Sequence, residues 1–191
     1  VEVPQRKGEP LKVSDDEEPK KVKFDRIPTV KPAFQKDGTV TAANASSIND
    51  GAAAVVLASR KKAQEMGLPI LGTIKNWASH AQVPEWFTTA PVGAINKVLS
   101  KADKKPEEVD LYEVNEAFAV VSLAVNKLAK LPAERVNING GAVALGHPIG
   151  CSGTRILVTL LHAMKQQGLN NGLASLCIGG GEATALYLER E

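Results

Sequence analysis

The sequence predicts an α/β protein in which helices pack on both faces of a layered sheet. Predicted strands and amphipathic helices alternate through the last third of the chain, and this alternation is typical of a sheet covered by helices. The composition agrees, because hydrophobic residues make up 43% and charged residues 23% of the 191 residues, as in ordinary globular proteins. A chain of this length buries a full core.

Charge, aromatic content and cysteine usage exclude several classes of protein. The net charge is only +2 and aromatic residues make up 4%, so the sequence predicts no nucleic-acid partner. No apolar run approaches the roughly 20 residues that cross a membrane, and residues 1–7 lack the apolar segment of a signal peptide. The two cysteines, Cys151 and Cys177, cannot build a disulfide framework and indicate a reducing compartment. We therefore expect a soluble protein of the cytoplasm, or of the mitochondrial matrix if the source is a eukaryote.

Residues 1–38 differ from the rest of the chain, because five prolines interrupt a strongly charged stretch. Such prolines exclude a long helix, so we expect an extended segment that crosses a surface. Two interpretations of its basic residues stay open. Lys21, Lys23 and Arg26 either face solvent as an ordinary charged loop or bind a phosphate.

The rest of the chain predicts short elements in a regular order. Ser59 and Gly67 have the positions of a helix N-cap and a helix-ending glycine. The expected elements are a strand at 39–43, a turn at 44–50, a buried strand at 51–58, a helix at 60–66, a strand at 70–74, a loop with Trp77, His80, Trp86 and Phe87, and a helix at 91–102. A strand at 109–113, a helix at 117–130, a glycine-rich turn at 140–146, a helix at 152–167 and strands at 173–178 and 183–188 follow.

Two polar clusters lie where predicted strands and helices meet. Asn115 and Glu116 stand at a strand-to-helix junction, where Asn115 has the ordinary role of an N-cap and Glu116 meets the helix dipole. Further along, five glycines surround His147 between residues 140 and 153. Gly146 and Pro148 make a rigid mount for the imidazole, so His147 is a candidate general base.

A third cluster places Cys177 at the end of a strand, just before the glycines at 179–181. A cysteine in an apolar strand is usually a small buried hydrophobe, but the glycines expose backbone N–H groups that can bind an oxyanion. The sequence has no CxxC or HExxH spacing and no glycine motif typical of phosphate or dinucleotide binding. We therefore expect no clustered metal ligands and no redox cofactor.

Together the three clusters resemble the C-terminal half of a thiolase. Asn-Glu-Ala-Phe, Gly-His-Pro-Ile-Gly and Cys-Ile-Gly-Gly-Gly occur in that family's order, and residues 38–53 resemble its segment beside the pantetheine arm of coenzyme A. The resemblance implies a layered βαβαβαββ half with a mixed sheet. Residues 1–38 would end a loop domain, residues 39–66 would hold the last strands of the N-terminal half, and residues 67–191 would form the C-terminal thiolase domain.

The resemblance also implies a reaction, the reversible Claisen condensation of two acetyl-CoA to acetoacetyl-CoA or the thiolytic cleavage of a 3-ketoacyl-CoA. The family's nucleophilic cysteine lies in the first half, and no residue of this chain matches it, so the chain would not be a whole thiolase. His147 would accept the nucleophile's proton, and Cys177 would remove the α-proton of the second acetyl-CoA. Asn115, through a water, and the N–H of Gly179 would help to bind the oxyanions.

Contacts to coenzyme A and to a cation follow from the same resemblance. The implied coenzyme A contacts are Ala42 and Ser46 beside pantetheine, Ala117 and Phe118 in the tunnel, Arg26 near the adenosine phosphates and Phe87 in the acyl-pocket loop. Some relatives use potassium, and the matching positions here are Ala42, Ala43, Ala45 and Val143.

The implied partners are an acyl-CoA, an N-terminal thiolase half on the same or a separate polypeptide, and further copies of the chain in a dimer or tetramer. Three other hypotheses stay open. The chain could be a non-catalytic CoA-binding or interaction module, or one subunit of a split thiolase. It could also be a small thioesterase whose nucleophile is Cys151, at a helix start just after His147.

Overall fold

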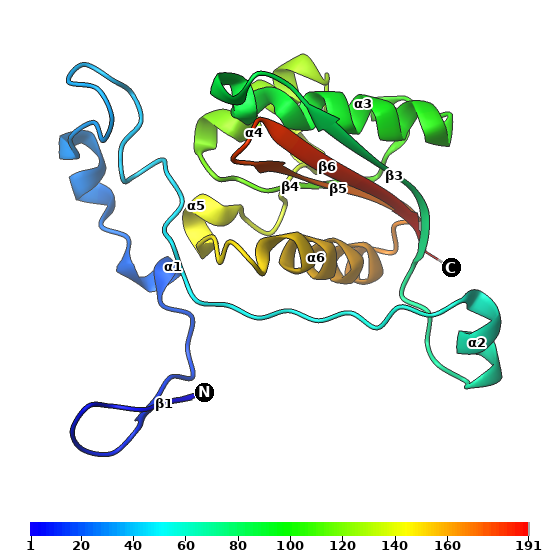
Figure 1. Cartoon of the computed structure of the whole chain (residues 1–191), viewed down its shortest axis with the longest axis horizontal. Helices are drawn as coiled ribbons and strands as arrows, with labels where there is room; N and C mark the ends of the chain where they lie inside the picture. Colours follow the sequence, from blue (N-terminus) through cyan, green and yellow to red (C-terminus); the bar gives the residue numbers. More distant parts are fainter. Residues whose placement is uncertain (191) are drawn as a thin grey trace.

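A four-stranded mixed sheet forms the centre of the fold in the computed structural model, which describes residues 1–190 (Figure 1). The strand order is β3-β6-β5-β4. Antiparallel pairs join β3 to β6 and β6 to β5, and a parallel pair joins β5 to β4. The strands are β3 (Thr73–Ala81), β4 (Leu111–Val114), β5 (Asn171–Ile178) and β6 (Glu182–Glu189). The predicted mixed α/β architecture is therefore confirmed.

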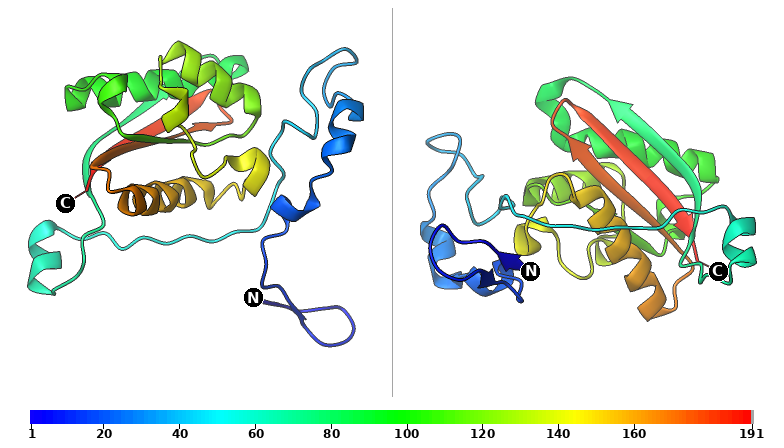
Figure 2. Two further views of the ribbon diagram at one scale, coloured as in Figure 1. Left: turned by 180° about the vertical axis from the view of Figure 1, so that it is seen from behind. Right: turned by 60° about the horizontal axis from the view of Figure 1, so that its bottom comes forward.

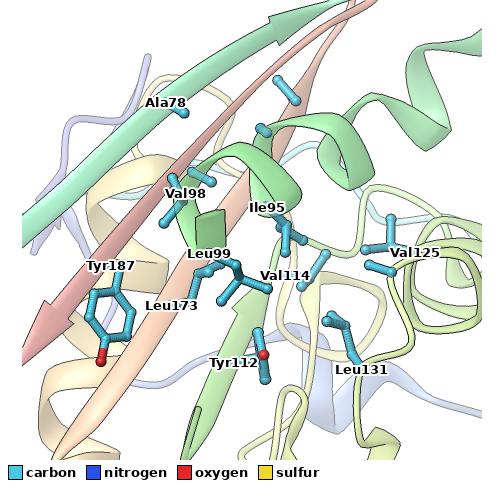
Figure 3. Close-up of a cluster of buried hydrophobic side chains, with 14 of the residues drawn as sticks. Ala78, Ile95, Val98, Leu99, Tyr112, Val114, Val125, Leu131, Leu173 and Tyr187 are labelled. Carbon is cyan, nitrogen blue, oxygen red and sulfur yellow. The ribbon is translucent and has the colours of Figure 1, made fainter. Parts of the chain in front are cut away.

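Helices cover both faces of this sheet. On one face, α3 (Ala90–Ala102) and α4 (Ala119–Leu128) pack against the sheet in one apolar cluster, part of which is shown in Figure 3. On the other face, α6 (Ser152–Gln167) packs in a second cluster. Figure 2 shows the same layers from two other directions. Helices α3 and α6 bury one apolar side, as the sequence periodicity predicts, whereas α4 also exposes Val120, Leu123 and Leu128.

The third strand of the expected βαβαβαββ order is reduced to one bridge. Val136 pairs with Tyr112 of β4 in an isolated parallel bridge, and the chain continues into the short helix α5 (Ala142–Leu145). Short 3-10 turns complete the unit at η2 (Pro84–Thr89), η3 (Pro106–Glu108) and η4 (Ala133–Arg135). None of the helices within residues 1–190 is long and apolar enough to cross a membrane.

The N-terminal part is extended and contains only short elements, as its prolines predict. These are β1 (Glu2–Val3), β2 (Leu11–Lys12), α1 (Glu18–Lys21), η1 (Phe24–Thr29) and α2 (Arg60–Glu65). The predicted cap of α2 is confirmed, because the Ser59 hydroxyl accepts a hydrogen bond from the Lys62 amide at 3.2 Å. Gly67 follows with a φ of +62°, a left-handed conformation that ends a helix.

Two strand predictions in this part are wrong. Residues 39–43 form a turn, because the Asn44 side chain bonds back to the Thr41 amide at 2.8 Å and to the Thr39 carbonyl at 2.9 Å. The apolar stretch at 51–58 runs extended beside α6, and it has no ladder partner within the described chain (Figure 1). Its side chains are correspondingly exposed, Val56 to 89% and Leu57 to 74%. Apolar composition predicted a buried strand, but a strand also needs a neighbour.

A third prediction misplaced a strand. The expected strand at 70–74 is found at Thr73–Ala81, so Trp77 and His80 lie in β3 and not in a loop. Trp77 is apolar but 66% exposed, so apolar and polar residues do not alternate here as they do in a typical half-buried strand. Pairing with β6 over the whole length of β3 decides its position, and that pairing involves residues far away in the sequence.

We predict that Ile95→Ala lowers the free energy of unfolding by about 2–5 kcal/mol, the usual effect of a cavity at a buried position. Ile95 on α3 is fully buried against the sheet. Urea denaturation followed by circular dichroism measures the change. The matched control is Leu123→Ala on α4, whose side chain is 69% exposed, and we expect a change within about 0.5 kcal/mol. Equal effects at the two positions would contradict this description of the core.

Candidate active site

Two of the predicted site residues lie at one edge of the sheet, where the parallel strands β4 and β5 end. Val114 pairs with Ser175, and the Asn115 amide extends the ladder by donating to the Ser175 carbonyl at 2.9 Å. Asn115 and Cys177 therefore leave neighbouring strands at the same end. In α/β proteins this carboxyl edge is where ligands usually bind.

His147 is brought to the same edge by the loop that precedes α6. Its Nε2 lies 3.4 Å from Asn115 Nδ2, and its Nδ1 lies 2.5 Å from Ser152 Oγ. The His147 amide donates to the Ser47 carbonyl at 2.9 Å, which fixes the backbone of the loop. Gly146 before it has a φ of +90°, and a β-carbon there would collide with the Asn49 side chain. Glycine is thus required at this position.

Asn115 is not the cap of the following helix, contrary to the ordinary interpretation of its sequence position. Helix α4 begins at Ala119 and Phe118 occupies its N-cap position without a side-chain hydrogen bond. Asn115 is 1% exposed, and its Oδ1 has no hydrogen-bond partner among the described residues. A buried amide oxygen without a partner is costly, so this atom is suited to bind a water or a polar group of a ligand.

Glu116 meets a helix dipole, but of a different helix from the one expected. Its carboxylate accepts a hydrogen bond from the Val143 amide at 3.1 Å, at the start of the short helix α5. A β-carbon on Gly141 would collide with this carboxylate. The residue after Asn115 is thereby joined to the glycine loop that leads to His147.

A connector made of residues 44–49 holds both loops. The amide and hydroxyl of Ser46 donate to the Ala117 carbonyl at 3.0 and 2.8 Å, and the Ala119 amide donates to the Asn44 carbonyl at 2.9 Å. The Ser47 carbonyl accepts from His147, as described above. Phe118, next to Ala117, also packs edge-on against Phe34 with ring centroids 6.1 Å apart. Ser46, Ala117 and Phe118 therefore lie together.

A basic cavity of about 290 Å³ lies between the N-terminal part and this site. Three cationic side chains and three small apolar residues contribute to its lining: Lys21, Lys23, Arg26, Ala42, Ala43 and Val143. Helix α1 contacts α5 here. Glu18 closes one side, where its carboxylate accepts hydrogen bonds from Lys21 at 3.2 Å and from Asn49 at 3.1 Å. The basic residues that are candidates for phosphate binding therefore line the same cavity as Ala42, Ala43 and Val143, which the resemblance implies for potassium.

Cys177 is partly buried near the end of β5, and burial raises the pKa of its thiol. The glycines at 179–181 form the turn into β6, and the space where a β-carbon of Gly179 would lie is open. Gly181 is held by the Gln82 amide, which donates to its carbonyl at 2.9 Å just before η2, the turn that carries Phe87. The described contacts include no hydrogen bond between Cys177 and His147, so the structure brings these two to one edge without joining them.

An ion pair that the sequence analysis missed lies beside the site. Glu113 on β4 is 2% exposed, and its Oε2 lies 3.8 Å from Nη1 of Arg155 on α6. Burial raises the pKa of Glu113 to about 7, although Arg155 opposes that shift. Burial lowers the pKa of His147, and the charge of Arg155 lowers it further. No sequence motif indicated this pair, because Glu113 and Arg155 come together only when α6 packs on β4.

The structure argues against the hypothesis that Cys151 is the nucleophile of a small thioesterase. Cys151 is partly exposed just before α6, but the hydrogen bonds of the two His147 nitrogens go to Ser152 and Asn115. A dyad of Cys151 with His147 would need one of those nitrogens.

Across residues 1–190, no group of three or more His, Cys, Asp or Glu side chains could hold a metal ion.

We predict that Glu113 lowers the free energy of unfolding of this chain as the pH rises from about 5 to about 7, and that Glu113→Gln removes this contribution from the slope. The folded carboxyl keeps its proton up to about pH 7, while the unfolded one loses it near its ordinary value of 4.5. The folded state thus binds more protons in this window, and raising the pH favours unfolding. Urea denaturation across this range measures the slope. Glu107→Gln, at an exposed glutamate, is the control and should keep the wild-type slope.

We also predict that Arg155→Gln raises the pKa of His147, because it removes a positive charge that opposes protonation of the imidazole. Histidine side-chain chemical shifts, followed by NMR against pH, measure this value directly. Arg155→Lys keeps the charge and serves as the matched control, with a pKa near that of the unchanged chain. A His147 pKa that does not respond to Arg155→Gln would contradict the proposed electrostatic contact.

Comparison with known proteins identifies the family. The profile of the Thiolase, C-terminal domain family matches residues 68–190, and that of the Thiolase, N-terminal domain family matches residues 1–61. An acetyl-CoA acetyltransferase of Pseudomonas aeruginosa is 53% identical over 192 residues, which cover 100% of this chain and 49% of the relative. The chain thus spans about half the length of the curated relatives it matches.

Solved structures agree with these matches. The crystal structure of the Bacillus anthracis acetyl-CoA acetyltransferase superposes with a TM-score of 0.94 at 45% identity, covering 100% of this chain and 48% of that one. The Acat5 thiolase from Ascaris suum, solved in complex with coenzyme A, gives a TM-score of 0.84 at 41% identity, covering 94% and 47%. With the three motifs at one edge of a thiolase-like sheet, these matches show that the chain belongs to the thiolase family.

Proposed function

We propose that this chain supplies the acid–base and oxyanion residues of an acetyl-CoA C-acetyltransferase-type thiolase. The reaction is the condensation of two acetyl-CoA to acetoacetyl-CoA, or its reverse, the thiolytic cleavage of a 3-ketoacyl-CoA. The contact of His147 Nε2 with the buried amide of Asn115, at the carboxyl edge that also holds Cys177, is the observation that carries this proposal. The relatives named acetyl-CoA acetyltransferase support the same reaction.

In the first half of the reaction, His147 acts as general base. A nucleophilic cysteine from an N-terminal thiolase half gives its thiol proton to Nε2 and attacks the thioester carbon of acetyl-CoA. The lowered pKa of His147 keeps the imidazole neutral and ready to accept that proton. The coenzyme A thiolate then leaves and takes the proton of the Cys177 thiol, the acetyl group stays on the nucleophile, and His147 keeps the proton that it received.

In the second half, Cys177 removes the α-proton of the second acetyl-CoA, and the resulting carbanion attacks the acetyl group. The raised pKa of the thiol suits this step, since a thiolate with a high pKa is a stronger base. Protonated His147 and a water on Asn115 Oδ1 stabilise one oxyanion, and the Gly179 N–H stabilises the other. Loss of one such donor raises a reaction barrier by about 3 kcal/mol.

We assign the basic cavity to coenzyme A. Arg26, Lys21 and Lys23 offer the positive charge that its phosphates need, and Ala42 leaves room for the pantetheine arm. Ser46 of the connector is hydrogen-bonded to Ala117, and we assign Ser46, Ala117 and Phe118 to the wall of the path that the pantetheine arm would follow. Gln82 connects the glycine turn after Cys177 to η2, which carries Phe87, and this connection supports Phe87 as the residue of the acyl pocket.

A potassium ion in the same region, held by backbone carbonyls as the resemblance implies, is part of this proposal. Ala42, Ala43 and Val143 line one cavity, and Ala45 forms a bridge with Phe118 nearby. Their small side chains leave backbone carbonyls as the available ligands, which is the donor type that potassium prefers. The ion would supply positive charge that orders the connector beside the coenzyme.

An N-terminal thiolase half, on the same or a separate polypeptide, completes the proposed enzyme. Val55, Val56 and Leu57 present apolar surface at the end of the region that matches the N-terminal family domain. Burial of these side chains would favour association of the two halves. A dimer or tetramer of the completed enzyme is part of the same proposal. A non-catalytic coenzyme A-binding module is the alternative, because the basic cavity requires no nucleophile.

A pulse of acetyl-CoA followed by intact mass measurement of every polypeptide in the preparation tests this function. We expect one acetyl group on a cysteine of the N-terminal half. Cys177→Ala should retain this adduct, because the leaving thiolate can take its proton from water, but it should lower acetoacetyl-CoA turnover by about 10²–10⁴-fold, because the base of the second step is lost.

His147→Ala should lose both the adduct and the turnover. Cys151→Ala is the matched control, with adduct and turnover unchanged. If the preparation contains only the 20.2 kDa chain and no acetyl adduct forms, the chain has no thiolase activity by itself, and the activity would belong to the longer protein from which it comes.

A further inference from the structure

The two nitrogens of the His147 ring have different partners, and this difference determines the chemistry the ring can perform. Nδ1 lies 2.5 Å from the hydroxyl of Ser152, and Nε2 lies 3.4 Å from the amide nitrogen of Asn115. A neutral imidazole carries one N–H, so one nitrogen donates and the other accepts. The base proposed above must have its lone pair on Nε2, the nitrogen on the Asn115 side.

We propose that Ser152 is a positioning residue that sets this tautomer: its hydroxyl oxygen accepts the Nδ1–H of His147 and leaves the Nε2 lone pair free. The use of the tautomer in catalysis rests on the function proposed above, but the tautomer itself does not. In the sequence, Ser152 is the first residue of a predicted helix, and no motif gives it a further role.

The hydrogen bonds of Ser152 support this direction. Its hydroxyl lies 3.0 Å from the Pro148 carbonyl, which can only accept, so the hydroxyl proton goes there. The Ser152 oxygen is then the acceptor for Nδ1–H. At the other end, the Asn115 amide nitrogen can only donate, so Nε2 must accept. Every contact in the series from Pro148 to Asn115 thus pairs one donor with one acceptor.

The opposite tautomer would reverse each of these contacts. With the proton on Nε2, two donors would face each other unless the Asn115 amide turned around to present Oδ1. The Ser152 hydroxyl would also have to turn from the Pro148 carbonyl to Nδ1. This reversed arrangement is the competing state, and the experiment below separates the two.

The backbone keeps the Ser152 oxygen in place. Ser152 is fully buried at the first position of α6, and its amide and that of Cys151 donate to the Pro148 carbonyl at 2.9 and 2.8 Å. Pro148 has a restricted φ and directly follows His147. On the other side, the His147 amide is bonded to the Ser47 carbonyl. The ring and the hydroxyl therefore belong to one short rigid turn.

In the proposed reaction, the thiol proton of the nucleophile moves to Nε2 and the proton on Nδ1 does not move. The ring becomes an imidazolium whose positive charge is stabilised by the Ser152 oxygen. Its new Nε2–H then points to the oxyanion. Ser152 thus acts through His147 and touches no reacting atom.

NMR of the whole chain with ¹⁵N-labelled histidine tests the proposal, because only three histidines are present. At a pH where His147 is neutral, long-range proton–nitrogen couplings report which ring nitrogen carries the proton. His147→Gln assigns the signals. We expect Nδ1–H for the unchanged chain. In Ser152→Ala the ring should move to mainly Nε2–H, the tautomer that histidine prefers in water, while the signals of His80 and His162 stay unchanged.

Two further variants complete the test. Ser152→Thr keeps the hydroxyl and should restore Nδ1–H. Ser175→Ala removes another fully buried serine hydroxyl, which donates to the Thr184 carbonyl and not to a histidine, and should leave the tautomer unchanged.

An Nε2–H tautomer in the unchanged chain overturns the proposal, and this result does not depend on whether Ser152→Ala folds. Retention of Nδ1–H in a folded Ser152→Ala also overturns it. If the chain shows the expected tautomers but no acetyl transfer, the inference holds and the proposed function fails.

Discussion

The parallel pairing of β4 with β5 is the constraint on which the site depends. Parallel strands cannot be joined by a tight turn, so the chain must cross the sheet before it returns. That crossover contains α4, α5 and α6, and His147 lies between the last two. The pairing places Asn115 and Cys177 at the carboxyl edge, and the crossover brings the imidazole to the same edge. One feature of topology thereby gathers three residues that are far apart in the sequence.

A crossover of this length needs further contacts to hold its loops, and residues 44–49 provide them. Backbone hydrogen bonds from this connector reach Ala117, Ala119 and His147, on both sides of the site. The C-terminal family domain begins only at residue 68, so these contacts come from the part that matches the N-terminal domain. The loops of the C-terminal domain that carry Ala117 and His147 are therefore held by a segment outside that domain.

Local signals were enough to predict much of the fold. The bounds of α6 and the cap at Ser59 are determined by neighbouring residues, and both predictions are confirmed. The position of β3 was missed because it depends on pairing with β6. Asn115 was given its ordinary role as a cap, although the helix starts four residues later, at Ala119. Motifs identified His147, but only the packed structure shows that Ser152 is its partner.

The pair of Glu113 and Arg155 contributes to the charge state of the site more than to stability. Two buried ions whose nearest atoms are 3.8 Å apart regain little of the energy lost on leaving water, and Arg155 has two buried nitrogens without a hydrogen bond. The Glu113 pKa of about 7 shows the same imbalance. Near neutral pH a fraction of Glu113 is protonated, and the Arg155 charge then acts on His147 unopposed. A pair that stabilises the fold poorly thus helps to keep the His147 imidazole neutral.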